Sequence, residues 1–421
     1  MKTRIATPVL AAGLAAFAAA CRKNPEIPYR FEPEPRAALA ESGAVLPRYP
    51  AVAAGRVASG TLFLLAVTGE EGNSAISFFL SENGGDSFRA PIRVSAPNSS
   101  AGAHGENAPR LLVRDDGPIY AAWNEAEDIR AARSDSFGAD FEAPVRITDK
   151  PAGAWSGYVS IGAASNGDFY CVWLDTRDSD NAPDTVSLYL ARSTDQGRSF
   201  GPNVRVARDV CPCCRPALAF GSGGEVLVFW RKVYRGSIRD MTVAVTRDGG
   251  RTFNAPRRIA EDNWKVDGCP DSGPATATVG HRVYAAWLTE ASPERSGVRL
   301  SYTDDGGSTW APTRTASQGV LDANYPSLTV TEGGRLVLVF QGRDPRRREG
   351  WAPIGAFVVE IRPDGTYAAP EALPGTADHS SVSRPVVAAG PNGRVFVAWT
   401  GVEAGKQTVF LERGRQTGIA R

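Results

Sequence analysis

The chain has 421 residues, of which 47 are Lys or Arg and 46 are Asp or Glu, so its formal net charge is +1. This balance provides no global field that would attract a polyanion or an anionic membrane surface. We therefore expect no nucleic-acid partner.

The first 20 residues have the composition of a secretory signal, because Lys2 and Arg4 precede an apolar stretch that ends in Ala18-Ala-Ala-Cys21. A cysteine directly after small residues resembles a bacterial lipoprotein box, in which Cys21 is lipidated and becomes the mature N-terminus. An ordinary cleaved signal peptide is the alternative. We expect an exported protein in the periplasm or at the cell surface, held at the outer membrane only by a lipid anchor.

Residues 21–46 contain four prolines and alternating charges with little apolar periodicity, which is typical of a tether. No later apolar run reaches the about 20 residues that a membrane-spanning helix needs. Residues 47–421 are predicted to form one folded domain.

A turn motif recurs along this domain. Its clearest copies are Ser-Thr-Asp-Gln-Gly-Arg-Ser-Phe at 193–200, Thr-Arg-Asp-Gly-Gly-Arg-Thr-Phe at 246–253 and Thr-Asp-Asp-Gly-Gly-Ser-Thr-Trp at 303–310. Looser copies occupy 81–88, 134–141 and 362–367, the first with Asn83 in place of Asp. The pattern predicts a tight hairpin turn in which the Asp carboxylate accepts backbone N–H groups and a Gly takes a positive φ. Asp195, Asp248 and Asp305 are therefore expected to be structural.

Each copy belongs to a repeat of short apolar strands. The predicted second strands are 61–69, 118–124, 168–174, 225–231, 282–288, 335–341 and 394–400. The predicted third strands are 75–80, 128–133, 187–192, 241–245, 298–302, 355–361 and 407–412. Short fourth strands are predicted in the first six repeats, at 90–94, 143–147, 203–206, 256–259, 312–315 and 370–373.

Seven repeats of about 50 to 60 residues, with Gly-rich turns and no helical periodicity, favour an all-β propeller. We predict seven blades of four antiparallel strands, with six blades as the alternative count. The seventh repeat lacks its own outer strand, which we expect the segment 29–31 to supply. The loops before the first strands, and those between second and third strands, should meet on one central face.

The turn motif resembles the Asp-box, or bacterial neuraminidase repeat, of sialidases and other Asp-box propellers. In that family the box lies on the face away from the active site. The resemblance covers nearly all of the domain and implies the fold more strongly than the activity. Sialidases have six blades, so a count of seven departs from them.

Two segments are similar to sialidase active-site motifs. Pro-Arg-Tyr-Pro at 47–50 resembles the Arg-Ile-Pro motif whose arginine binds the substrate carboxylate, which implies that role for Arg48. Asn-Tyr-Pro-Ser at 324–327 resembles the segment of the nucleophilic tyrosine, which implies that role for Tyr325. The alternative is that both residues simply begin their strands.

Other polar residues precede predicted first strands. Arg215, Arg384 and Arg110 are candidates for further carboxylate-binding arginines, whereas Asp-Ser-Gly-Pro-Ala at 271–275 contains no arginine where the family usually has one. Glu106, next but one to His104, is the candidate general acid or base. No cofactor is expected.

Six cysteines give the most unusual signal. Cys171 is in an apolar strand and is expected to be buried and inert. Cys211, Cys213, Cys214 and Cys269 precede the first strands of consecutive repeats, so we expect them to be neighbours at the central face. In an exported protein such a set favours disulfides, with Cys269 joined to Cys211 or Cys213, and the alternative is a soft-metal site for Cu(I) or Zn²⁺.

Two functions follow. The first is an exo-α-sialidase type of glycoside hydrolase that acts on acidic glycans as a monomer. The second is a non-catalytic propeller that binds a glycan, a protein partner or a soft metal through a cysteine-stapled central face.

Overall fold

The computed structural model describes residues 29–39, 42–55, 60–70, 72–115, 117–179, 186–346, 352–376 and 382–417. The predicted signal at 1–20, the lipidation at Cys21 and the first part of the tether lie outside these ranges. Within them, no helix is long and apolar enough to cross a membrane.

The described part of the chain is all-β, and its strands form six sheets with antiparallel neighbours. The first sheet contains β3 (Arg48–Ala54), β4 (Leu62–Thr68), β5 (Ala75–Ser81) and β6 (Ile92–Arg93). The second contains β7 (Ala101–Gly102), β8 (Arg110–Val113), β9 (Ile119–Glu125), β10 (Asp128–Ser134) and β11 (Val145–Arg146).

The third sheet has eight strands and combines two repeats. Its first half contains β12 (Ser156–Ala163), β13 (Phe169–Asp175), β14 (Val186–Ser193) and β15 (Val204–Val210). Its second half contains β16 (Ala217–Phe220), β17 (Val226–Tyr234), β18 (Ile238–Thr246) and β19 (Arg257–Arg258). The pair Val210 and Lys232 joins the halves.

The fourth sheet contains β20 (Ala275–Val279), β21 (Arg282–Thr289), β22 (Gly297–Thr303) and β23 (Arg314–Thr315). The fifth contains β24 (Leu321–Val330), β25 (Leu336–Arg343), β26 (Gly355–Ile361) and β27 (Glu371–Ala372). Short 3₁₀ helices are η2 (Pro293–Arg295) and η3 (Pro374–Thr376). The predicted second and third strands agree with these bounds to within a few residues, whereas most fourth strands are only two residues long.

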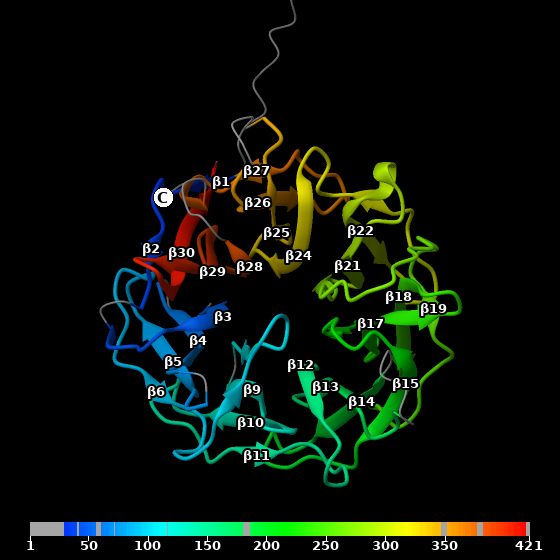
Figure 1. Ribbon diagram of the computed structural model, residues 1–421, viewed down its shortest axis with the longest axis horizontal. Coiled ribbons are helices and arrows are strands. Elements are labelled where there is room, and N and C mark those ends of the chain that lie inside the picture. The colour runs from blue at the N-terminus through cyan, green and yellow to red at the C-terminus, as the bar shows by residue number, and fades with distance from the viewer. Residues whose placement is uncertain are drawn as a thin grey trace, which may run out of the picture.

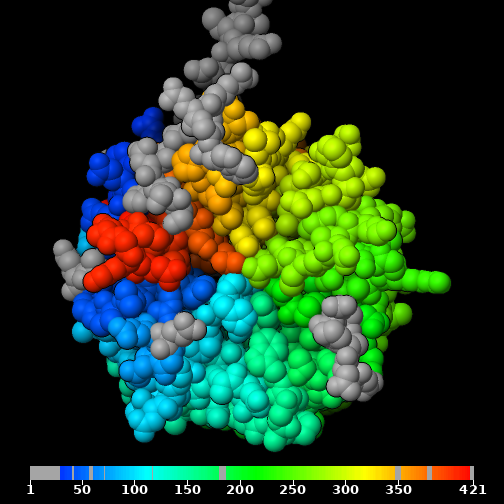
Figure 2. Space-filling model, viewed as in Figure 1, coloured from blue at the N-terminus to red at the C-terminus, as the bar shows by residue number. Residues whose placement is uncertain are grey.

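The last sheet joins the two ends of the described chain. It contains β28 (Ser383–Ala389), β29 (Arg394–Glu403), β30 (Lys406–Gln416), β1 (Tyr29–Phe31) and β2 (Arg36–Ala37). Tyr29 pairs with Gln416 and Phe31 with Gly414, so the prediction that this N-terminal segment supplies the outer strand is confirmed. The sheets lie around a common centre, and the blue and red ends of the chain are adjacent (Figures 1 and 2).

The second strand of each repeat is apolar along its whole length because neighbouring sheets cover both of its faces. In β9, Ile119, Ala121 and Trp123 pack with residues of the first sheet, whereas Tyr120 and Ala122 pack with residues of β12 and β13. The same arrangement places the first sheet against the last, because β4 packs on β29 and β30. Sequence alternation therefore determines which neighbour each side chain contacts.

The predicted turn motif is formed by side-chain hydrogen bonds. Asp305 Oδ1 accepts the backbone N–H groups of Ser308 and Thr309, each at 2.9 Å, and its Oδ2 accepts the Thr309 hydroxyl at 2.6 Å. Gly307 has φ +90°, and a Cβ there would lie 3.0 Å from Leu227, so the turn packs directly on the neighbouring strand. Asp195 and Asp248 make equivalent bonds.

Strand register places this turn away from the starts of the first strands. Thr303, the first residue of the motif, pairs with Val283 at the start of β21. Ala275, at the start of β20, pairs with Ala286 near the opposite end of β21. The turn and the start of the first strand are therefore at opposite ends of the sheet.

These turns should make the folding stability of the protein vary with pH in the acidic range. Hydrogen bonds from Thr309 lower the pKa of Asp305 from 3.8 to about 2 in the folded protein. A lowered folded pKa gives stabilisation that is present above about pH 4 and is lost as the pH falls to about 2. We expect Asp305→Asn to lower the unfolding temperature above pH 4, with the difference from wild type vanishing near pH 2, as measured by thermal denaturation at pH 2 to 6.

Asparagine is a suitable replacement because Asn83 already makes the same turn, with Oδ1 accepting the Ser87 N–H at 3.0 Å. The triple variant with Asp195→Asn, Asp248→Asn and Asp305→Asn should enlarge the effect. The exposed Asp267→Asn serves as the control. A difference that stays constant down to pH 2 would contradict the prediction.

Candidate functional site

A cavity of about 190 Å³ lies where the first strands of the repeats converge. The first strands that contribute to its lining are β3, β8, β12, β16, β20, β24 and β28. Polar residues in its wall come from segments far apart in the sequence. They are Tyr49, Glu106, Arg110, Ser160, Arg215, Thr276, Tyr325, Ser327, Ser383, Arg384 and Thr400. Five of the six residues predicted for catalysis or substrate binding are therefore in one place, and the sixth, Arg48, is not among the lining residues.

A repeated backbone irregularity marks the beginning of β3, β12, β24 and β28. In each, the register with the second strand shifts, as in a β-bulge. The aromatic and arginine residues with positive φ at these shifts are Tyr49, Tyr158, Tyr325 and Arg384, at 53°, 57°, 54° and 49°, and Asp322 in β24 also has a positive φ, at 52°. Such backbone strain is unusual for large side chains and is concentrated at functional sites.

Tyr325, Asp271 and Arg384 form a polar cluster at the cavity. The Arg384 guanidinium donates through Nη2 to Asp271 Oδ2 at 2.6 Å and to the Tyr325 hydroxyl oxygen at 3.1 Å. Its Cζ lies 4.5 Å from the centre of the Tyr325 ring. The Tyr325 hydroxyl in turn donates to Asp271 Oδ2 at 3.4 Å. Three different sheet regions thus supply one hydrogen-bonded group.

Burial raises the pKa of Tyr325 to about 12, and the Asp271 carboxylate adds to this shift whereas Arg384 opposes it. At neutral pH the tyrosine therefore keeps its proton and directs it at Asp271. A phenol that donates to a carboxylate is arranged to lose its proton to that carboxylate when its oxygen forms a new bond.

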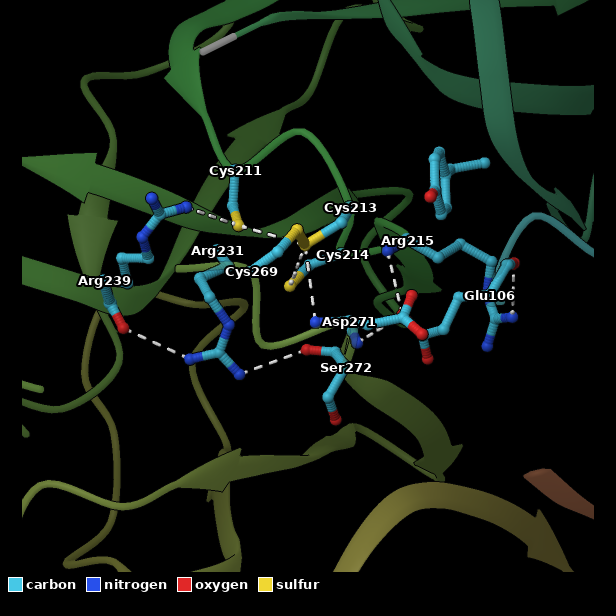
Figure 3. Close-up of a disulfide and its surroundings, with 12 residues drawn as sticks. Glu106, Cys211, Cys213, Cys214, Arg215, Arg231, Arg239, Cys269, Asp271 and Ser272 are labelled. Atoms are coloured by element: carbon cyan, nitrogen blue, oxygen red, sulfur yellow. Dashed lines mark hydrogen bonds between the residues drawn. A yellow bond between two sulfur atoms is a disulfide. The ribbon is translucent and has the colours of Figure 1, made fainter. Parts of the chain in front are cut away.

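Glu106 is buried and connects its own segment to two others that are distant in the sequence. Its Oε2 accepts the backbone N–H of Arg215 at 3.0 Å and that of Gly273 at 2.5 Å, and its own carbonyl accepts Arg215 Nη1 at 3.3 Å. Burial raises its pKa, although Arg215 opposes the shift. Figure 3 shows the carboxylate beside Arg215 and Asp271. Its contacts are those of a residue that positions the backbone.

Arg110 and Arg215 are close enough to interact electrostatically. Burial first, and then the positive charge of Arg215, lower the pKa of Arg110 to about 9, so it is still protonated at neutral pH. Arg48, by contrast, donates through Nη1 to the carbonyl oxygens of Gly69 at 2.6 Å and Leu46 at 3.2 Å. Its neighbour Tyr49 lines the cavity instead.

The structure explains why the segment 271–275 has no arginine before its proline. A Cβ at Gly273 would lie 2.1 Å from the carbonyl oxygen of Arg215, so a side chain there would collide with backbone. Asp271, two residues earlier, reaches the cavity cluster in place of an arginine. Sequence reasoning missed Asp271, although an acidic residue in the segment lacking the expected arginine was the available signal.

His104 is an exposed residue. Its Nε2 atom lies 3.4 Å from the Tyr158 hydroxyl oxygen, and the two rings make an edge-to-face contact. Neither residue is among those that line the cavity. Gly105 lies between His104 and Glu106, and a Cβ there would lie 2.9 Å from Asp271 Oδ1. The tight loop therefore brings the Asp271 carboxylate against the backbone beside Glu106.

The predicted cysteine cluster is present, and one of the two predicted pairings is formed. A disulfide joins Cys213 to Cys269 with their Cα atoms 6.2 Å apart (Figure 3). Cys211 and Cys214 are buried free thiols, as is Cys171 in β13. The backbone N–H of Asp271 donates to Cys213 Sγ at 3.4 Å, so the disulfide adjoins the residue that holds Arg384.

Solved structures with a similar fold have low sequence identity. A Dyadobacter fermentans protein of unknown function is 16% identical, with a TM-score of 0.53 over 77% of this chain and 96% of its own. A Penicillium chrysogenum α-L-arabinanase complexed with arabinobiose is 14% identical, with a TM-score of 0.51 over 74% and 94%. A Hadza microbial sialidase is 14% identical, with a TM-score of 0.49 over 86% and 75%.

No curated protein sequence matches the chain. The sequence profile of the BNR repeat-like domain matches residues 71–339, which is more than half of the chain. The chain therefore belongs to the BNR repeat-like domain family.

Proposed function

We propose that this protein is a carbohydrate-active enzyme, and specifically a glycoside hydrolase of exo-α-sialidase type that acts on acidic glycans. The observation that carries this proposal is the Tyr325 hydroxyl held between Asp271 and Arg384 in a cavity that Arg110 and Arg215 also line. The arrangement provides a nucleophile, a proton acceptor and cations in one place. The fold, shared with an arabinanase, is compatible with glycan substrates.

Tyr325 is the proposed nucleophile. A neutral phenol avoids the charge repulsion that a carboxylate nucleophile would have against an anionic sugar. As its oxygen bonds to the anomeric carbon, the bond from that carbon to the aglycone oxygen breaks, the aglycone takes a proton from water, and Asp271 takes the phenolic proton across the 3.4 Å contact. Water then attacks the anomeric carbon, which releases the free sugar and returns the proton to the Tyr325 oxygen. Arg384, which touches both groups, stabilises the carboxylate before the transfer. We assign Glu106 to positioning the cavity wall, with its predicted acid or base role as the alternative.

The arginines determine the proposed substrate class. Arg110, Arg215 and Arg384 are cations on three different strand starts, although the chain as a whole has a net charge of only +1. Guanidinium groups bind carboxylates in a bidentate manner, and a partly buried cavity strengthens that interaction. A sugar with a carboxylate, such as a sialic acid, is therefore the preferred ligand.

A non-catalytic glycan-binding protein is the second candidate. It is favoured by the pairing of Arg384 with Asp271 and of Arg215 with Glu106, which engages both guanidinium groups inside the protein. The two candidates predict the same ligand charge and differ only in turnover.

We also infer that the repeats form seven blades around this cavity, with the eight-stranded sheet counted as two. The packing of β4 on β29 and β30 supports a closed ring. Seven first strands then surround one site, and export with lipidation at Cys21 would place that site at a membrane surface.

Replacement of Tyr325 by Phe should abolish hydrolysis of an aryl α-sialoside, because only the nucleophilic oxygen is removed. The unfolding temperature and the binding of free sialic acid should remain close to those of the wild type. Tyr367→Phe, which removes a hydroxyl bonded to the Thr315 carbonyl outside the cavity lining, is the matched control. Wild-type protein that binds the sugar without turnover would support the second candidate.

Arg110→Lys should raise KM for the same sialoside by about tenfold to a hundredfold. Lysine keeps the charge but loses the bidentate fork, and a hydrogen bond to a charged group is worth roughly 1.5–3 kcal/mol. Steady-state kinetics measures the effect. Arg93→Lys is the control because Arg93 is on the outer strand β6 and donates to the carbonyl oxygens of Ser95 and Ala96, away from the cavity lining. An unchanged KM in Arg110→Lys would remove this residue from the binding site.

Glu106→Gln and Glu106→Ala separate positioning from proton transfer. Glutamine keeps an oxygen that can accept both backbone N–H groups, so we expect activity within about threefold of wild type and a normal fold. Alanine leaves two buried N–H groups unpaired and should destabilise the protein by about 1–3 kcal/mol for each. Urea denaturation and sialoside hydrolysis measure the two effects. Loss of activity in a fully folded Glu106→Gln protein would instead make Glu106 the acid or base.

A further inference from the structure

The cysteine cluster contains two free thiols in contact with a disulfide. Cys211 Sγ lies 3.7 Å from Cys213 Sγ, and Cys214 Sγ lies 4.0 Å from it on the same loop. Cys211 and Cys214 are fully buried, whereas Cys269, the other half of the disulfide, is an exposed residue. The three sulfur atoms of the loop are all within 4.8 Å of one another. A structural disulfide alone does not require this arrangement.

Two buried arginines adjoin the cluster. Arg239 donates through Nη1 to Cys211 Sγ at 3.0 Å (Figure 3). Arg231 donates to the carbonyl oxygens of Arg239, Ser272 and Leu288. Among the described residues, neither guanidinium forms an ion pair with a carboxylate. Because a buried charge needs a compensating charge, a thiolate at Cys211 is the anion that this geometry supplies.

The thiol groups of Cys211 and Cys214 have pKa values that are shifted in opposite directions. A hydrogen bond from Cys214 lowers the pKa of Cys211 to about 6, with Arg231 and Arg239 adding to the effect and burial opposing it. Burial raises the pKa of Cys214 well above its ordinary value, so Cys214 stays a thiol. A thiolate in contact with a disulfide sulfur is the attacking group in thiol–disulfide exchange.

We propose that Cys211, Cys213 and Cys269 form a thiol–disulfide exchange site that reacts with external disulfides through Cys269. The Cys211 thiolate attacks Cys213 Sγ, a bond forms between Cys211 and Cys213, the bond between Cys213 and Cys269 breaks, and Cys269 leaves as a thiolate. No electrons are gained or lost in this step. The Cys269 thiolate then attacks an external disulfide, forming a mixed disulfide and releasing one thiolate.

Exchange moves negative charge from a buried sulfur to an exposed one. In the starting form the thiolate is paired with Arg239, which favours the Cys213–Cys269 bond at rest. Reaction of Cys269 with an external disulfide consumes the exposed thiolate. This shifts the exchange equilibrium towards the form with the Cys211–Cys213 bond. The ligand class is therefore a low-molecular-weight disulfide or an accessible disulfide of another protein, and oxidised glutathione is the simplest probe.

The full-length protein, incubated with oxidised glutathione at pH 7 and quenched with acid, tests the proposal. Peptide mapping without reduction should find one glutathione on Cys269 and a bond between Cys211 and Cys213. Cys211→Ala should lower the rate of glutathione addition to Cys269 at least tenfold, whereas Cys171→Ala, which removes a buried thiol from β13, should leave it unchanged.

Arg239→Gln provides a second test that retains every cysteine, with circular dichroism to verify that the variant is folded. The rate should fall because the thiolate loses its cationic donor. Three results would overturn the proposal. They are no glutathione on wild-type Cys269, equal rates in folded Cys211→Ala or Arg239→Gln, and a stoichiometric soft-metal ion on the cysteines of the purified protein.

Discussion

The structure depends on the packing of each second strand between two neighbouring sheets. Trp123, Trp173, Trp230, Trp287 and Trp399 are fully buried in these strands. Burial of apolar surface on both sides holds each sheet face to face with the next, and a succession of such contacts turns the chain around a centre. Because the sheets are arranged in this way, the first strand of each repeat lies next to that centre. The cavity is a consequence of this packing.

Hydrogen bonds between distant segments then fix the cavity wall. Glu106 joins the second repeat to backbone of the fourth and fifth, and Asp271 joins the fifth to Tyr325 and Arg384. The Cys213–Cys269 disulfide reinforces the same place. Hydrogen bonds between several segments restrict the movement of the groups around the Tyr325 hydroxyl, and the proposed role of Tyr325 requires such positioning.

Local patterns predicted much of the fold. Apolar runs predicted the second and third strands. The spacing of Asp, Gly and aromatic residues predicted the turns, because the hydrogen bonds of each turn are made within its own short segment. The segment 29–31 could be placed because the last repeat lacked an outer strand. The two-residue fourth strands were predicted too long, because an edge strand has few cross-strand partners and its apolar residues pack under turns as well.

The site was harder to predict because it is assembled from contacts between repeats. The positions of Arg110, Arg215, Tyr325 and Arg384 could be predicted, since each lies within the first strand of its repeat or just before it. The direction of each side chain could not, because it depends on bulges that sequence spacing does not reveal. Arg48 and Tyr49 illustrate this point: the shift in register takes the arginine to carbonyl oxygens and the tyrosine to the cavity. Asp271 was missed because its partners are 54 and 113 residues away.

The left-handed residues at the strand starts have an implication for the evolution of this protein. Tyr49, Tyr325 and Arg384 line the cavity, and each holds a backbone conformation that glycine would adopt more easily, so each such position carries strain of about 1–3 kcal/mol. Mutational drift towards glycine there would relieve the backbone while deleting a side chain around the cavity. Selection for thermostability and selection for the cavity side chains therefore oppose each other at these three positions.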